Sequence, residues 1–153
     1  MDITASSSQS FNAPINFSFN SLTSTASNVG ALQITDDRGT NAGWTVNLTA
    51  TDWKSGQDVM QLDYDGAGSD NNLGKLCAFP NNANLSAASG SLTGVDKQSN
   101  ACFSAAVQTI DLVAATAPNG TGAYWLTDMS LGQYIPSAPT AQVYTTTIIY
   151  TIQ

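Results

Sequence analysis

The fold is decided by residues 34–53, ITDDRGTNAGWTVNLTATDW. This stretch predicts the end of one strand, a polar turn over residues 36–43 and a second strand that begins at Trp44. Apolar and polar residues alternate along the second strand, with Trp44, Val46, Leu48 and Ala50 on one face and Thr45, Asn47, Thr49 and Thr51 on the other. Such alternation is typical of a strand with a buried face and a solvent-facing one. We therefore expect a central hairpin with Trp44 in the core and Asn47 in solvent.

The composition of the 153-residue chain also favours strands. All eleven acidic residues are Asp, and Lys and Arg together number four. Helix surfaces are normally built from Glu, Lys, Arg and Gln, whereas Thr, Val, Ile, Gly and Asn suit strands and turns. The length is that of one ordinary domain with a core of its own. We predict one all-β domain over residues 1–153.

Further strand-like runs follow along the chain, and turn residues separate them. They lie near residues 15–19, 31–35, 60–64, 73–79, 107–113, 124–131 and 143–152. In the run over 124–131, the face of Trp125, Thr127, Met129 and Leu131 is predicted to be buried. Pro136 and Pro139 cannot donate backbone hydrogen bonds, so residues 132–141 are expected at a sheet edge or in a loop. Together with short strands in the less patterned stretch 83–100, this predicts an antiparallel β-sandwich of eight to ten strands with Greek-key or jelly-roll-like links.

The charge of the chain excludes one class of partner. The formal net charge is −7 and the pI is about 4.1, whereas nucleic-acid binding needs clusters of basic residues that neutralise phosphates. The sequence contains no run of 18 apolar residues, so no membrane span is predicted. The first residues also lack the charged and apolar regions of a signal peptide.

The cysteines and the asparagines indicate an extracellular location. Cys77 and Cys102 are the only cysteines, and a bridge between them would close a loop of about 25 residues and add roughly 3 kcal/mol by the loop-entropy model. The alternative is two unrelated buried thiols. Acceptor patterns for N-glycosylation occur at Asn16, Asn47, Asn84 and Asn119.

The residues needed for common catalytic sites are missing from the sequence. It contains no histidine, which excludes Ser-His-Asp and Cys-His catalysis and ordinary zinc sites. A glycosidase could use two carboxylates, and Asp36, Asp37 and Asp52 flank the predicted hairpin. Asp in turns, however, usually satisfies local backbone groups. We therefore expect no enzymatic activity.

One loop carries a hypothesis of a metal site. Asp63, Asp65 and Asp70 are interleaved with glycines, and Ca²⁺ prefers carboxylate ligands on a chain that can wrap around it. The loop departs from the EF-hand pattern at Ala67 and Gly74. A nonstandard calcium site and a plain solvated turn both fit, and the sequence implies no other cofactor.

Aromatic residues offer a second kind of candidate site, for stacking against sugars. Trp44 and Trp125 lie on faces that are predicted to be buried, so core packing explains both. Trp53, at the end of its strand beside Lys54, is the candidate for ligand stacking. Tyr64 and Tyr134 are further aromatics that a binding module could expose.

The Trp44 strand and the last strand carry a family likeness. The chain resembles the WxL surface domains of bacterial cell-wall proteins, which have a Trp-x-Leu element after an Asp-Arg-Gly-rich turn and a distal Tyr-x-x-x-Leu-Thr-Trp-x-Leu element. The first element corresponds to DRG at residues 37–39 and GWTV at residues 43–46, with Val46 in the place of Leu. The second corresponds to YTTTIIYTI at residues 144–152, with Tyr150 in the place of Trp. The resemblance implies a non-catalytic, secreted β-sandwich that attaches to the cell surface through peptidoglycan.

Two functions follow from these observations. The first is a structural subunit that polymerises with copies of itself into a filament or coat by donating residues 1–20 as a strand. Its pocket-filling side chains would be Phe11, Ile15, Phe17 and Phe19. The alternative is a module that binds cell-wall polysaccharide or peptidoglycan and functions in adhesion. Residues 1–20 could equally form the first strand of their own sandwich.

Overall fold

The computed structural model describes residues 1–153 except 6–7, 9, 12–21, 27–28, 63–73 and 137–141. The described part is all-β, with one single-turn 3-10 helix at Pro80–Asn82. The strands are β1 (Asp2–Thr4), β2 (Leu22–Ala26), β3 (Leu32–Asp36), β4 (Trp44–Ala50), β5 (Trp53–Ser55), β6 (Asp58–Met60), β7 (Leu76–Phe79), β8 (Asn84–Gly90), β9 (Val95–Lys97), β10 (Ala101–Cys102), β11 (Ile110–Ala115), β12 (Gly122–Thr127), β13 (Ser130–Ile135) and β14 (Ile148–Ile152). The predicted all-β class is confirmed. Strands outnumber the prediction because several runs are interrupted where the chain changes sheets.

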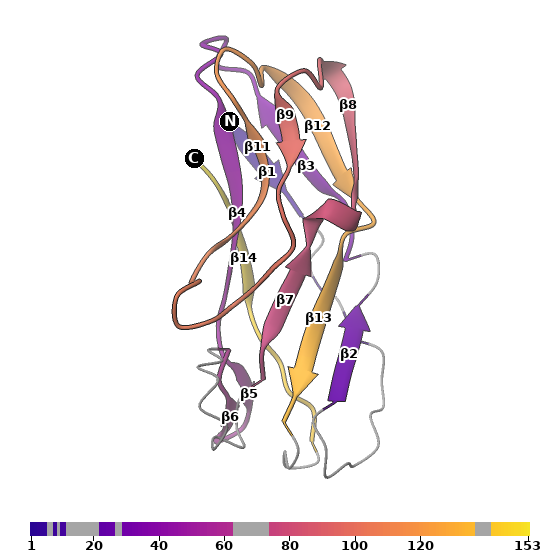
Figure 1. Ribbon diagram of the computed structural model, residues 1–153, viewed down its shortest axis with the longest axis vertical. Helices are drawn as coiled ribbons and strands as arrows, with labels where there is room; N and C mark the ends of the chain where they lie inside the picture. The colour runs from indigo at the N-terminus through magenta and orange to yellow at the C-terminus, as the bar shows by residue number, and fades with distance from the viewer. Residues whose placement is uncertain (6–7, 9, 12–21, 27–28, 63–73, 137–141) are drawn as a thin grey trace.

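The strands form a sandwich of antiparallel sheets (Figure 1). One sheet has the order β14-β4-β11-β9. Two others have the orders β1-β3-β12-β8 and β10-β7-β13-β2, and they follow each other along the long axis because β13 comes directly after β12 (Figure 1). A small hairpin of β5 and β6 lies at the end opposite the 36–43 turn.

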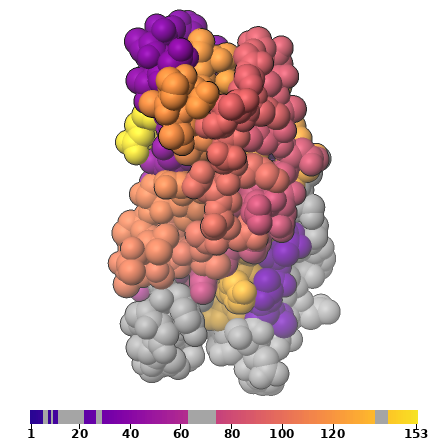
Figure 2. All heavy atoms as spheres, turned by 45° about the horizontal axis from the view of Figure 1, so that its top comes forward, coloured from indigo at the N-terminus to yellow at the C-terminus, as the bar shows by residue number. Residues whose placement is uncertain are grey.

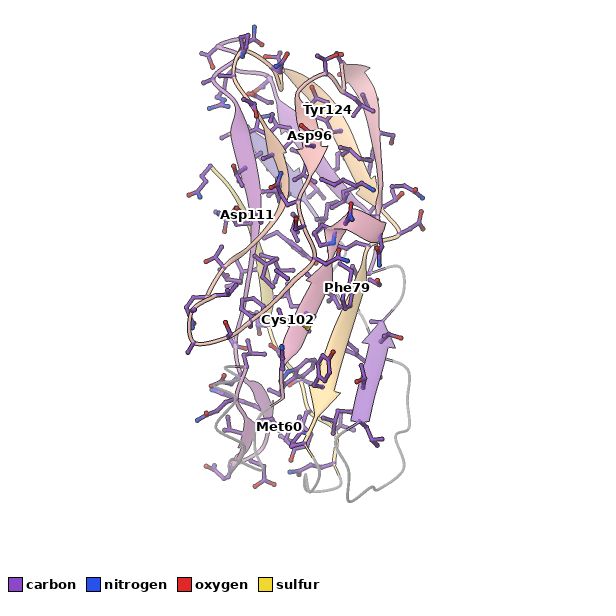
Figure 3. The ribbon with its side chains drawn as sticks, viewed as in Figure 1. Met60, Phe79, Asp96, Cys102, Asp111 and Tyr124 are labelled. Atoms are coloured by element: carbon purple, nitrogen blue, oxygen red, sulfur yellow. A yellow bond between two sulfur atoms is a disulfide. The ribbon has the colours of Figure 1, made fainter. Side chains whose placement is uncertain are left out.

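One hydrophobic core runs along the long axis between the sheets. Met60 lies near one end of this core and Tyr124 near the other (Figure 3). The strand patterns explain the core, since alternate residues such as Val46, Leu48 and Ile34 are fully buried. In β11 a register shift between Asp111 and Val113 places Leu112 and Val113 both in the core.

The predicted central hairpin is wrong. β3 and β4 are consecutive in the chain but lie in different sheets, β3 between β1 and β12 and β4 between β14 and β11. The turn between them bends through left-handed backbone at Gly39, Asn41 and Gly43 and carries the chain from one layer to the other. Alternation correctly placed Trp44, Val46 and Leu48 of β4 in the core, but it contains no information about which strand pairs with which.

Two smaller expectations also fail. Asn47 is buried, with 8% of its surface exposed, and lies between Asp111 of β11 and Thr151 of β14. Its predicted place in solvent is therefore wrong. Residues 130–135 form β13, which lies between β7 and β2 rather than at an edge. Pro136 ends this strand instead of excluding it from the sheet.

Residues 83–100 make an excursion through both layers. β8 pairs with β12 in one sheet, and β9 pairs with β11 in another. A disulfide joins Cys77 and Cys102, which lie opposite each other on β7 and β10, at the two ends of this excursion. The bridge therefore closes the excursion at its base.

Candidate functional site

The two elements that resemble the family motifs become neighbours in the fold. β14 pairs antiparallel with β4, and Ile152 lies opposite Val46 and Tyr150 opposite Leu48. The Thr45 N–H donates to the Gln153 carbonyl at 2.9 Å, and the Gln153 N–H donates to the Thr45 carbonyl at 3.1 Å. Residues separated by about 100 positions thus form a single two-stranded unit at a sheet edge.

The side chains of β14 alternate as predicted. Ile148, Tyr150 and Ile152 are partly buried and pack against the core, whereas Ile149 between them is 52% exposed. Burial raises the pKa of the Tyr150 hydroxyl. At the position of the distal motif Trp, this chain therefore uses Tyr150 as a packing residue.

Trp44 acts as a scaffold residue at one end of the core. Its side chain is 3% exposed, and its indole N–H donates to the Gly120 carbonyl at 2.8 Å. Its ring centroid lies 5.6 Å from that of Tyr124, whose hydroxyl donates to the carbonyls of Thr121 and Ser91. Burial raises the pKa of Tyr124, and the charge of Asp36 adds to this effect. The expected core role of Trp44 is confirmed.

Asp36 is held by the turn that follows it. Arg38 donates from Nε to Oδ1 at 2.8 Å and from Nη2 to Oδ2 at 3.0 Å, and its backbone N–H also donates to Oδ1. The hydrogen bond from Arg38 lowers the pKa of Asp36. Asp52 accepts from the backbone N–H of Leu62. Both carboxylates therefore satisfy local groups, as expected for Asp in turns.

Trp53, the candidate for ligand stacking, lies in the core rather than at the surface. Trp53 is only 4% exposed, its indole N–H donates to the Gly74 carbonyl at 2.9 Å, and Phe11 packs edge-on against it at 5.4 Å. Trp53 is the first residue of β5 and lies opposite Met60 of β6, which is also buried. The sequence around Trp53 did not indicate that the hairpin of β5 and β6 would bury the indole.

Trp125 is the tryptophan that the structure leaves partly exposed. Tyr124 and Leu126, on either side of it in β12, are completely buried, so Trp125 points to the outer face of the sheet. The prediction that Trp125 shares a buried face with Met129 and Leu131 is therefore wrong for Trp125, whereas Met129 and Leu131 are buried. Asp128, at φ 59°, turns the chain between Trp125 and Met129 and reverses the parity.

A small polar hollow of about 130 Å³ lies at the end of the molecule that carries Trp44. It is lined by Asn41, Ser91, Thr93, Pro118, Asn119, Gly120, Thr121 and Tyr124, and Figure 2 shows the three chain segments that contain them gathered at this end. The Thr121 hydroxyl donates to Asn41 Oδ1 at 2.6 Å. The lining is uncharged, but several of its polar groups already bond one another.

Of the remaining predicted positions, only some lie within the described residues. Asp63, Asp65, Asp70, Tyr64, Asn16, Ile15, Phe17 and Phe19 lie outside the described residues. Within the described ranges, no group of three or more acidic, Cys or His side chains is placed to hold a metal ion. Asn84 is exposed and donates to Asp128, Asn119 is partly exposed, and Tyr134 is 43% exposed with the Lys75 ammonium 5.5 Å from its ring.

The N-terminal segment is partly placed. β1 pairs antiparallel with β3, with Ile3 opposite Ile34, and Phe11 packs against the core. The N-terminal ammonium also lies 3.3 Å from Asp37 Oδ1. In this structure β1 therefore belongs to the sandwich of its own chain.

The fold and the pairing of β4 with β14 define a structural class, an antiparallel β-sandwich with Trp44 buried in its core. A family model described as "WxL domain surface cell wall-binding" matches residues 2–153, so the chain belongs to the WxL domain family and is a cell-surface domain. The match covers nearly the whole sandwich, and the suspected resemblance is confirmed. No curated protein and no solved structure matches the chain. No helix in the part of the chain that the structure describes is long and apolar enough to span a membrane.

Proposed function

We propose that this domain attaches non-covalently to the bacterial cell wall by binding peptidoglycan. The observation that carries the proposal is the family match over residues 2–153, whose description names wall binding at the surface. The pairing of β4 with β14 is consistent with it, because the two segments that resemble the family motifs are adjacent strands in this chain. The folded sandwich as a whole is then the binding unit.

The chemistry of the surface is consistent with a saccharide ligand. The chain has few basic residues and a net charge of −7, so it cannot attract an anionic polymer through its overall field. Its exposed strand β8, for example, presents Asn84, Ser86 and Ser89. Such side chains suit the hydroxyl and amide groups of wall glycans.

Sedimentation with purified sacculi tests this proposal. The folded protein should be depleted from the supernatant in proportion to the amount of sacculi, whereas a cellulose suspension of equal mass should leave it in solution. Heat-unfolded protein provides the control for non-specific adsorption. Equal recovery of folded protein with and without sacculi would contradict wall binding.

A second function, self-assembly by strand donation, is favoured by a single feature. No described strand pairs with the outer edge of β14, and the register directs the backbone groups of Ile148, Tyr150 and Ile152 towards that edge. Another copy could add a strand there. Light scattering after size exclusion should then show polymers that disappear in a variant lacking residues 1–20, whereas a monodisperse full-length monomer would contradict donation.

A further inference from the structure

The outer face of the β1-β3-β12-β8 sheet carries a partly exposed aromatic residue at its centre. β12 lies between β3 and β8, and Trp125 is near its middle. Trp44 and Trp53 are 3% and 4% exposed, whereas Trp125 is partly exposed and is the most accessible of the three tryptophans. Trp125 points away from the buried core cluster and is not among its residues.

The strand register places polar side chains on both sides of this indole. Trp125 lies directly opposite Gln33 of β3 and Ser86 of β8, and Gln33 lies opposite Thr4 of β1. Cross-strand partners of this kind have Cβ atoms about 5 Å apart. The row Thr4–Gln33–Trp125–Ser86 therefore crosses the whole sheet over about 14 Å, at ~4.8 Å for each strand spacing.

The neighbouring positions keep the indole accessible. Ala123, two residues before Trp125 on the same face, has a side chain of only one methyl group. Its backbone N–H donates to Ser89 Oγ at 3.1 Å. Thr127, two residues after Trp125, lies opposite Asn84. The result is a surface with one large ring among hydroxyl and amide groups.

The chemistry of this surface selects a class of ligand. The face of a pyranose ring is lined with C–H groups and packs against an indole, while its hydroxyl and acetamido groups need donors and acceptors at the rim. The row itself carries no charge, and the whole chain carries −7. A neutral, N-acetylated glycan therefore fits better than an anionic wall polymer.

We propose that the outer face of this sheet binds the glycan strands of peptidoglycan, with Trp125 stacking on a sugar ring and Gln33 and Ser86 hydrogen-bonding beside it. This inference rests on the proposed wall-binding function and assigns it a surface. The motif strands β4 and β14 then support the sandwich, and recognition takes place on another sheet.

Two variants and one matched control test the proposed surface in the sacculus assay. Trp125→Ala should weaken apparent affinity about tenfold or more, since truncating a central aromatic is among the costliest changes at a binding surface. Trp125→Tyr retains an aromatic ring, so its apparent affinity for sacculi should fall much less. Tyr134→Ala removes an exposed aromatic from a different sheet and should bind as the wild type does. Far-UV circular dichroism and thermal unfolding verify that each variant is folded.

Tryptophan fluorescence gives a second readout with soluble chitooligosaccharides as the probe. Because Trp44 and Trp53 are buried, a blue shift and protection from acrylamide quenching would report on Trp125, and both should be absent in Trp125→Ala. If wild type and folded Trp125→Ala bind sacculi equally, the proposed binding surface around Trp125 is wrong, but the proposal that the domain binds the wall is not contradicted. If the wild type leaves sacculi unbound, both proposals are wrong.

Discussion

At the scale of single residues, the Trp44 end of the core depends on a close approach between an indole and a glycine. Gly120 has φ 104°, and a Cβ added there would lie 2.6 Å from Trp44 Nε1 and 2.5 Å from the Ala115 Cβ. The same glycine accepts the indole hydrogen bond through its carbonyl. Both its backbone conformation and its missing side chain are therefore required.

Gly120→Ala should lower the free energy of unfolding by about 3 kcal/mol or more, because backbone strain and steric overlap act together. Gly39→Ala is the matched control. Gly39 has φ 66° but nothing within 4 Å of an added Cβ, so only the strain of about 1 kcal/mol remains. Urea unfolding of both variants measures the difference, and equal losses would contradict the steric argument.

The pair of Asp36 and Arg38 predicts a pH dependence. The hydrogen bond from Arg38 holds the pKa of Asp36 below its ordinary value in the folded state. The pair therefore stabilises the fold fully above the unfolded-state pKa of about 3.9, and this stabilisation is lost as the pH falls through the folded-state pKa.

Arg38→Gln should accordingly have a lower Tm than the wild type at neutral pH, and the gap should narrow on acidification. Thermal unfolding monitored over a pH series measures it. A gap of constant size down to strongly acidic pH would show that the ionised carboxylate is not what Arg38 stabilises.

At the scale of elements, alternation predicted faces well and neighbours poorly. It placed Trp44, Val46 and Leu48 in the core correctly, because the side-chain period of a strand is local. It could not show that β3 and β4 lie in different sheets, since pairing depends on residues far away in sequence. The error at Trp125 has a comparable cause, because a single left-handed residue, Asp128, changes the parity between β12 and β13.

The candidate site illustrates the same limit. The sequence singled out Trp53 by its position at a strand end, but the hairpin of β5 and β6 and the approach of Gly74 bury it. The surface around Trp125 assembles residues from four strands. No short sequence window contains that row, so only the register reveals it.

Alternation within β14 supplies a prediction with an internal control. Tyr150→Ala should reduce stability by about 2 kcal/mol, because the ring packs against the core. The adjacent Ile149 is 52% exposed, and Ile149→Ala should change stability by less than about 0.5 kcal/mol. Chemical denaturation of the pair measures this contrast, and the reverse order would mean that β14 presents its other face.

At the scale of the whole molecule, the net charge determines how binding to the cell wall depends on salt. A chain of charge −7 is repelled by anionic wall polymers, and salt screens that repulsion. Binding to sacculi through a neutral glycan should therefore be unchanged or stronger at high salt. Sedimentation at low and high sodium chloride concentrations measures this, and a steep loss of binding with salt would indicate ionic recognition instead.

The disulfide at the base of the excursion has a mechanical consequence. Cys77 and Cys102 are 25 residues apart, and β8 and β9 lie between them in two different sheets. When the chain is pulled from its ends, tension passes through the sulfur bridge and bypasses these residues. About 85 Å of contour length, at ~3.4 Å per residue, is not extended until the disulfide is reduced. The unfolded chain under force is therefore shorter by this length when the disulfide is intact.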